Sequence, residues 1–351
     1  MVSPLPSKLL SWFDQHGRRH LPWQQDISPY RVWVSEIMLQ QTQVSTVIPY
    51  FERFMASFPS VQHLAEAPAD AVLHHWTGLG YYARARNLHR AAKVICNEHA
   101  AVFPATVDGL CALPGIGRST AGAIVSIACG GRAPILDGNV KRVLARYHAV
   151  DGWPGRTAVA RELWQLAERH TPSQRLADYT QAIMDLGATL CTRGRAACER
   201  CPQAADCRAL ALGRQAEFPG RKPPQKSRRL RTAEFALAWD GSAVLLERRP
   251  AAGIWGGLWS LPEIGDEETA EDWCRRRLGA EPPAVERWET VEHSFTHYDL
   301  HMRPVLIRLE ERPGAVRDED DERWVDVADD GQLGLPAPVR RLLDRLGDPG
   351  I

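Results

Sequence analysis

Residues 113–123 read LPGIGRSTAGA, an apolar turn with two glycines that leads into a run typical of a helix. Gly115 and Gly117 permit a tight turn whose backbone N–H groups, with a helix N-terminus behind them, can face a phosphate oxygen. We therefore expect two short helices over about 108–127, with Leu113, Gly115 and Gly117 in a candidate phosphate-binding turn. Glycine-rich turns between helices also occur without any ligand, so the rest of the chain must decide.

The length and charge of the chain predict two domains with different partners. At 351 residues with 44% hydrophobic content, the chain can bury two cores. Lys and Arg outnumber Asp and Glu by 29 to 17 through Arg231 (+12) and are outnumbered 14 to 26 from Thr232 onward (−12). A basic domain joined to an acidic one favours a polyanion, above all nucleic acid, as the partner of the first. With no run of about 18 apolar residues and no secretory signal, we expect a cytoplasmic protein that does not contact membranes.

Hydrophobic periodicity predicts a helical first domain and a mixed second one. Apolar residues recur at three- and four-residue intervals over residues 44–58, 61–76, 83–98, 117–129, 139–147, 158–169 and 176–190. Pro49 should bend the first of these helices or shift its start. After residue 231 the pattern changes to short strand-like runs, with helices expected at 267–278 and 336–346. The predicted domains are 1–212 and 232–351, joined by a basic linker at 213–231.

Four cysteines lie at spacings typical of metal ligands. They are Cys191, Cys198, Cys201 and Cys207, in the segment CTRGRAACERCPQAADC. In a cytoplasmic chain such a cluster favours metal ligation over disulfides. Four thiolates suit either tetrahedral zinc or an iron–sulfur cluster, and the spacing does not separate the two.

Several long motifs together resemble a known family. LPGIGRSTAGA, then ILDGNVKRV at 135–143 and the cysteines at 191–207, resemble the helix-hairpin-helix superfamily of base-excision DNA glycosylases. WVSEIMLQQTQV at 33–44 and GLGYYARARNLH at 78–89 narrow the resemblance to the MutY-type adenine DNA glycosylases. The resemblance implies an all-α glycosylase domain, and it favours a [4Fe-4S] cluster over zinc.

The implied reaction is hydrolysis of the N-glycosidic bond of adenine mispaired with 8-oxoguanine or guanine in double-stranded DNA. Such cleavage needs an acid that protonates the leaving group and a carboxylate that stabilises the positive charge of the oxocarbenium-like sugar. By similarity Glu36 protonates adenine at N7, and its apolar neighbours should raise its pKa. Asp137 is expected to cap the helix that follows it and to stay ionised, with Asn139 orienting it. The alternative for Glu36 is a solvated helix flank.

Other site residues follow from the same resemblance. Arg19, Leu21, Trp23, Gln181 and Ser119 map to the adenine pocket. Gln41 and Tyr82 map to groups that enter the duplex, although they could also be ordinary surface and core residues. In endonuclease III relatives a lysine stands at position 119 and cuts the strand through a Schiff base. Because serine has no amine for that step, Ser119 predicts a monofunctional glycosylase.

The second domain resembles a Nudix domain without the metal site. RRPAAGIWGGLWSLPE at 248–263 resembles the glycine and tryptophan loop of such domains, but the glutamates that would hold Mg²⁺ are missing. We therefore expect an α+β domain that recognises 8-oxoguanine through Phe295, Thr296 and His297. The alternative is a strand turn without a ligand.

Three other functions compete with this prediction. An endonuclease III-like glycosylase and lyase is disfavoured by Ser119, and a non-catalytic iron–sulfur DNA-binding protein by Glu36 and Asp137. A nucleotide-pool hydrolase is disfavoured by the missing metal ligands. We expect a monomer acting in the cytoplasm, at the nucleoid if the source is a bacterium.

Overall fold

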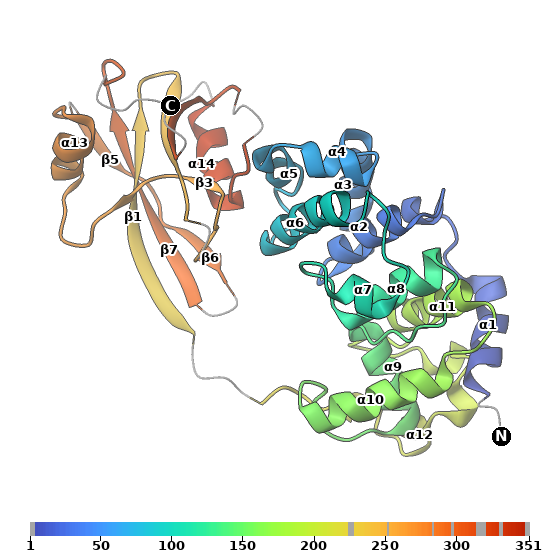
Figure 1. Ribbon diagram of the computed structural model, residues 1–351. Coiled ribbons are helices and arrows are strands. Elements are labelled where there is room, and N and C mark those ends of the chain that lie inside the picture. The colour runs from blue at the N-terminus through green and yellow to red at the C-terminus, as the bar shows by residue number, and fades with distance from the viewer. Residues whose placement is uncertain are drawn as a thin grey trace. The chain divides into compact units, whose positions relative to one another are not determined.

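The computed structural model describes residues 4–223, 228–250, 253–282, 284–295, 298–313, 321–329 and 333–347 (Figure 1). The chain forms two compact units. The first consists of Met1–Glu66 and Asn87–Pro224, and the second of Ala67–Arg86 and Gln225–Ile351. Among the described residues, no helix is long and apolar enough to cross a membrane.

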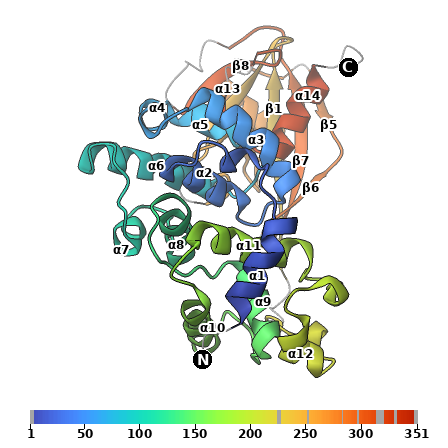
Figure 2. The ribbon, with the colours of Figure 1, turned by 90° about the vertical axis from the view of Figure 1, so that its right-hand side faces the viewer.

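The first unit is helical, as the periodicity predicts. Its helices are α1 (Leu5–His16), α2 (Pro29–Leu39), α3 (Val44–Ser57), α4 (Val61–Glu66), α7 (Val107–Cys111), α8 (Arg118–Ala128), α9 (Gly138–His148), α10 (Thr157–His170), α11 (Leu176–Thr189) and α12 (Arg208–Ala211), with short 3₁₀ turns at Pro22–Gln24, Cys198–Arg200, Ala204–Asp206 and Gln215–Glu217. Helix α6 (Ala83–Glu98) begins in the second unit and continues in this one. Helix α11 packs against α1, α8 and α9, and Figure 2 shows it behind α1.

Two prolines affect the expected helices differently. The helix expected over 61–76 is two helices, α4 and α5 (Ala69–His75), separated at Pro68. Proline lacks a backbone N–H and disfavours helical geometry in the residue before it, so it ends the first helix. Pro49 does not shift the start of α3, which begins at Val44 and continues through the proline.

The turn of residues 112–117 joins α7 to α8. Leu113 and Ile116 are buried, whereas Gly115 and Gly117 are exposed, so the apolar side chains anchor the turn and the glycine backbone faces outward. Gly115 has φ +77, and a Cβ added there would lie 2.6 Å from the Cβ of Asn87 in α6. Only glycine satisfies both the left-handed backbone and the close approach.

The second unit is built on an eight-stranded mixed sheet, in agreement with the predicted α+β class. The strands are β1 (Arg229–Trp239), β2 (Ala243–Arg248), β3 (Trp259–Ser260), β4 (Glu263–Ile264), β5 (Ala284–Arg287), β6 (Val291–Ser294), β7 (Tyr298–Arg308) and β8 (Glu322–Asp326). The order is β3-β2-β1-β7-β5, while β4, β6 and β8 pair with β1, β7 and β2. Strands β1 and β7 are parallel from Arg229↔Tyr298 to Trp239↔Arg308, and the other pairs are antiparallel.

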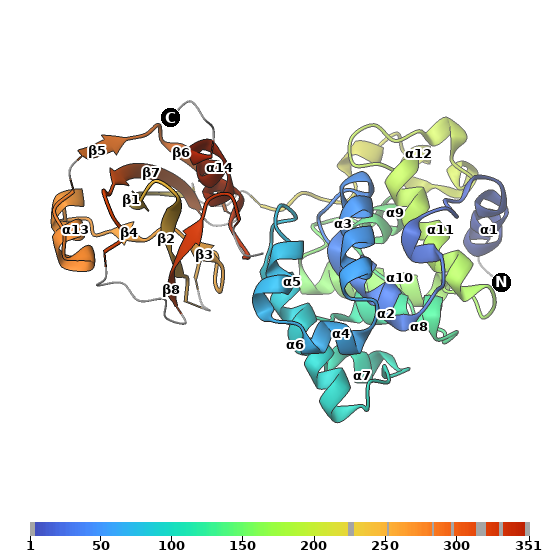
Figure 3. The ribbon, with the colours of Figure 1, turned by 90° about the horizontal axis from the view of Figure 1, so that it is seen from above.

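Two helices flank this sheet, close to where the sequence predicts them. They are α13 (Ala270–Leu278) and α14 (Ala337–Leu346), and Figures 1 and 3 show them on opposite sides of the strands. Trp273 and Cys274 of α13 pack with Ala236, Val305 and Ile307 of the sheet in one buried cluster. Strand β1 begins at Arg229, inside the stretch predicted as linker.

The two exposed glycines of the turn should respond differently to alanine. Gly115→Ala forces a left-handed alanine, which costs about 1–2 kcal/mol, and adds a clash with α6. Gly117 has φ −91 and open space around its Cα, so Gly117→Ala should change the free energy of unfolding by less than about 0.5 kcal/mol. Urea unfolding of both variants measures this difference, and equal stability would contradict the packing described.

Candidate active site

Glu36 lies on α2, and the residues around it are apolar and buried. Val34, Ile37 and Met38 are at most 3% exposed. The helix starts with Pro29 in its first turn and the Ser28 hydroxyl accepting the N–H of Arg31, so its register is fixed locally. Desolvation, and secondarily the charge of Asp137, raise the pKa of Glu36 to about 8. A carboxyl in this environment carries a proton at neutral pH.

Asp137 caps α9, as the sequence predicts. Its Oδ1 accepts the N–H of Val140 at 2.7 Å, and the carboxylate also interacts with the N–H of Asn139. Burial raises the pKa of Asp137, while these backbone hydrogen bonds and the positive Arg142 and Lys141 lower it. The two carboxyls therefore differ, because Asp137 has hydrogen bonds that favour its charged form and Glu36 is governed by desolvation and a like charge.

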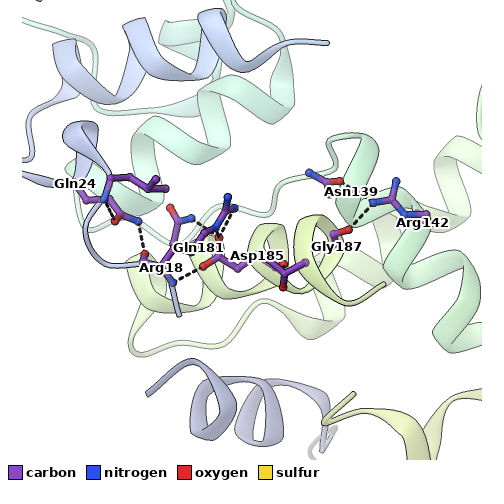
Figure 4. A network of polar contacts seen from close by, with 9 residues as sticks. Arg18, Gln24, Asn139, Arg142, Gln181, Asp185 and Gly187 are labelled. Atoms are coloured by element: carbon purple, nitrogen blue, oxygen red, sulfur yellow. Dashed lines mark hydrogen bonds and ion pairs between the residues drawn. The ribbon is translucent and has the colours of Figure 1, made fainter. Parts of the chain in front are cut away.

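The side chain of Asn139 is oriented by α11 and an arginine (Figure 4). Its Oδ1 accepts from Arg142 Nη2 at 2.8 Å, and Arg142 also donates to the carbonyls of Gly187, at 2.7 Å, and Cys191, at 2.6 Å. Asn139 approaches Gly187 so closely that a Cβ there would lie 2.6 Å from its own. The backbone of Asn139, as well as its side chain, thus contributes to the position of Asp137.

A second network places Gln181 (Figure 4). Asp185, fully buried on α11, accepts from Gln181 Nε2 at 2.8 Å, from Arg18 Nη2 at 2.6 Å and from the Arg18 backbone N–H at 2.9 Å. Gln24 donates to the Arg18 carbonyl at 2.8 Å and accepts the N–H of Leu21 at 3.1 Å. The buried charge is paired and hydrogen-bonded, which is the condition for keeping it inside.

The other residues mapped to the adenine pocket lie in mixed surroundings. Leu21 and Trp23 are buried, and Trp23 packs edge-on against Phe51 with ring centroids 5.6 Å apart. Arg19 is exposed and pairs with Asp14 at 3.2 Å. The Ser119 hydroxyl accepts the N–H of Leu136 at 2.9 Å, which ties the start of α8 to the segment carrying Asp137.

The residues mapped to duplex entry differ in exposure. Gln41 is exposed with φ +59, directly after α2. Tyr82 is exposed only in part, and its hydroxyl donates to the Leu335 carbonyl at 2.9 Å. Its neighbour Tyr81 is 52% exposed with φ +50, and Arg84 lies 5.6 Å from its ring centroid. Tyr81 is thus the more available aromatic side chain of this pair.

The four cysteines line one cavity between α9, α11 and α12. The cavity has an empty volume of about 330 Å³, part of it open to solvent, and is otherwise lined mainly by apolar residues. The buried Arg146 donates to Cys191 Sγ at 3.4 Å and to the Thr192 carbonyl at 2.8 Å, so a positive charge lies beside the sulfurs. Burial raises the pKa of Cys201 to about 11. Within the described residues, no three Cys, His, Asp or Glu side chains converge as ligands of one metal ion.

Of the three residues expected to recognise 8-oxoguanine, only Phe295 is described. Thr296 and His297 lie outside the described residues. Phe295 stacks on Tyr298 with ring centroids 4.8 Å apart, and its N–H donates to the Tyr298 carbonyl at 2.9 Å.

Comparison with known proteins identifies the family. Residues 34–169 match the family described as HhH-GPD superfamily base excision DNA repair protein, and residues 234–345 match the NUDIX domain family. The adenine DNA glycosylase of Buchnera aphidicola subsp. Acyrthosiphon pisum is 34% identical over 96% of this chain and 95% of its own. The human adenine DNA glycosylase is 34% identical over 92% of this chain and 70% of its own. The chain belongs to the adenine DNA glycosylase family.

Solved structures support the fold of the helical part of the chain. A thermostable thymine-DNA glycosylase matches 59% of this chain and 95% of its own, with 26% identity and a TM-score of 0.54. An endonuclease III–DNA complex matches 60% of this chain and 94% of its own, with 20% identity and a TM-score of 0.51.

Four further residues of the candidate site were not predicted from the sequence. They are Arg18, Tyr81, Arg142 and Asp185. Asp185 stands between the apolar Met184 and Leu186, much as Glu36 stands beside Ile37, and could have been found from the sequence. Arg18 and Arg142 both donate to residues of α11, which is distant from Arg18 and Arg142 in the sequence. The residues next to each arginine give no sign that it, and not another arginine, reaches this helix.

Gly187→Ala should favour helix formation in α11 but displace Asn139 from its position in the site. Glycine to alanine inside a helix normally gains about 1 kcal/mol, but the clash with Asn139 should cost about 1–3 kcal/mol. We expect Gly187→Ala to unfold at lower temperature and to lose glycosylase activity. Gly138→Ala, where the added Cβ meets nothing, is the stability control. A Gly187→Ala protein more stable than wild type would contradict the close packing of α9 on α11.

Proposed function

We propose that this family member flips adenine out of double-stranded DNA and hydrolyses its N-glycosidic bond when adenine is opposite 8-oxoguanine or guanine. The observation that carries the proposal is the pair of neighbouring carboxyls: desolvation and the charge of Asp137 raise the pKa of Glu36 to about 8, while backbone N–H groups hold Asp137. The proposed enzyme acts as a monomer in the cytoplasm, at the nucleoid if the source is a bacterium.

The two carboxyls take opposite roles in the proposed mechanism. Glu36 donates its proton to N7 of adenine, so that the base leaves as a neutral molecule. The Asp137 carboxylate stabilises the positive sugar and accepts the proton of the attacking water. Asn139 and Arg142 hold the segment that carries this carboxylate. Leu21, Trp23 and Gln181, with Arg19 at the edge, are the proposed contacts to the flipped base.

Base flipping leaves a gap in the duplex, and a side chain has to fill it. Flipping costs a few kcal/mol, which stacking and phosphate contacts must offset. Gln41 and Tyr81 are both exposed, and both lie between helices with positive φ. We propose Gln41 and Tyr81 for this role, with Tyr82 supporting Tyr81. Leu113, Gly115 and Gly117 form the proposed phosphate-binding turn.

The proposed enzyme is monofunctional. The Ser119 hydroxyl oxygen accepts the Leu136 N–H and offers no amine for a Schiff base. Strand cleavage would therefore require alkali after the base is lost.

Cys191, Cys198, Cys201 and Cys207 are the proposed ligands of a [4Fe-4S] cluster. The fit rests on their donor chemistry, since four sulfurs line one largely apolar cavity and the guanidinium of Arg146 can offset their negative charge. A bound cluster would cross-link the end of α11 to α12 through iron–sulfur bonds.

We propose that 8-oxoguanine is recognised by Phe295, Thr296 and His297. Support comes from the aromatic stacking at Phe295 and from the hydroxyl of threonine, which can hydrogen-bond a base edge. The net acidity of the chain after Thr232 argues for a local contact with one base over broad phosphate binding.

Single-turnover assays test the function directly. Duplexes carry adenine opposite 8-oxoguanine, adenine opposite guanine, or thymine glycol, and products are read with and without alkali. We expect adenine release from the first two and strand cuts only after alkali. Asp137→Asn keeps a side-chain cap but loses the charge, so it should fold and bind the duplex while excision falls by at least about 100-fold. No adenine release by wild type would overturn the function.

The pH dependence follows from the raised pKa of Glu36. The protonated acid predominates below pH about 8, so kcat/KM should fall as pH rises through this value. A second fall at acid pH is expected when Asp137 takes up a proton. Glu36→Gln should lose most activity, and because it removes a buried acid it should be more stable than wild type at pH about 9. A wild-type kcat/KM that stays constant across pH about 7–9 would contradict Glu36 as the proton donor.

A further inference from the structure

A short helical segment, residues 67–86, belongs by its contacts to the second unit. Asp70 at the start of α5 accepts from Arg248 Nη2 at 3.0 Å and from Trp259 Nε1 at 3.2 Å. The carboxylate is mostly shielded from water, with 21% of its side chain exposed. These hydrogen bonds fix α5 against the sheet strands β2 and β3 of the same unit.

The C-terminal end of this segment is also hydrogen-bonded to the rest of the second unit. The Tyr82 hydroxyl donates to the Leu335 carbonyl at 2.9 Å. One turn further along, Arg86 of α6 donates through Nη1 to the Gly256 carbonyl at 2.6 Å. Tyr81, the exposed aromatic proposed to enter the duplex, therefore lies between two anchors of the second unit.

The loop that receives Arg86 is strained and packs on Phe295. Trp255 has φ +54, a left-handed backbone conformation that residues with a bulky side chain rarely adopt. Its ring is 7% exposed and lies 5.6 Å from the Phe295 ring and 5.7 Å from the His293 ring. Phe295 in turn stacks on Tyr298. The contacts of the indole hold Trp255 in this conformation.

These contacts form one continuous path from Arg86 through the Gly256 carbonyl and Trp255 to Phe295. We propose that Arg86 and Trp255 are positioning residues that couple recognition of 8-oxoguanine at Phe295 to the placement of Tyr81, and so determine the preference for adenine opposite 8-oxoguanine over adenine opposite guanine. The inference rests on the proposed function. Guanine lacks the oxidised edge, so excision opposite guanine does not use this path.

The test compares single-turnover rates of the full-length protein on the two mispairs at saturating enzyme. Arg86→Ala and Trp255→Phe should lower the rate opposite 8-oxoguanine about tenfold, in the range of typical couplings between sites. The rate opposite guanine should stay within about twofold of wild type, because the chemistry at Glu36 and Asp137 is unchanged. Trp255→Phe retains an aromatic ring and a folded unit if Arg86→Ala does not fold.

Two variants of the same unit serve as matched controls. Trp288→Phe shortens another buried indole, 7% exposed, and Arg303→Ala removes an exposed arginine of β7. Neither residue lies on the path, so both should keep the wild-type ratio of the two rates. Equal loss on both mispairs, an unchanged ratio in the Arg86 and Trp255 variants, or the same change in the controls would overturn the coupling. Loss of all adenine release in wild type would instead overturn the proposed function.

Discussion

The carboxylate of Asp137 caps α9 and at the same time lies near enough to Glu36 for its charge to raise the pKa of Glu36. A cap fixes the carboxylate within hydrogen-bonding distance of the Val140 N–H, and such a cap is worth about 1 kcal/mol. Two carboxyls in one buried site cannot both ionise without a large electrostatic cost. The backbone hydrogen bonds favour the charged form of Asp137, and the proton therefore goes to Glu36. The acid and base assignments follow from where the helix begins.

Helix α11 gives this arrangement its second support. Asp185 pairs with Arg18 and Gln181 near the middle of the helix, and Gly187 admits Asn139 half a turn further on. A buried ion pair is a poor source of net stability, since desolvation offsets most of the attraction. It does fix which side chains face each other, because removing one partner would leave a buried charge unpaired. The polar groups of α11 are therefore better understood as fixing geometry than as adding stability.

Much of the fold was predictable because its signals are local. Helical periodicity, the mixed second unit, the Asp137 cap and the turn at Gly115 depend on residues near one another in the sequence, and the structure contains all of them. Pro68 divides a predicted helix because one proline outweighs an otherwise continuous apolar stripe. The partners of Arg18 and Arg142 were not predictable, because any of several arginines could reach α11 and tertiary packing decides which one does. The relative exposure of Tyr81 and Tyr82 depends on Leu335, more than 250 residues away.

Residues 67–86 precede most of the helical domain in the sequence but pack with the C-terminal unit. The segment lies inside the stretch that matches the helical repair family, yet its contacts place it in the second unit. Helix α6 carries Arg86 and Asn87 as neighbours, and the first donates to Gly256 while the second packs against Gly115. The division between the two units therefore falls inside α6, between Arg86 and Asn87, and an uninterrupted helical pattern in the sequence gives no sign of it.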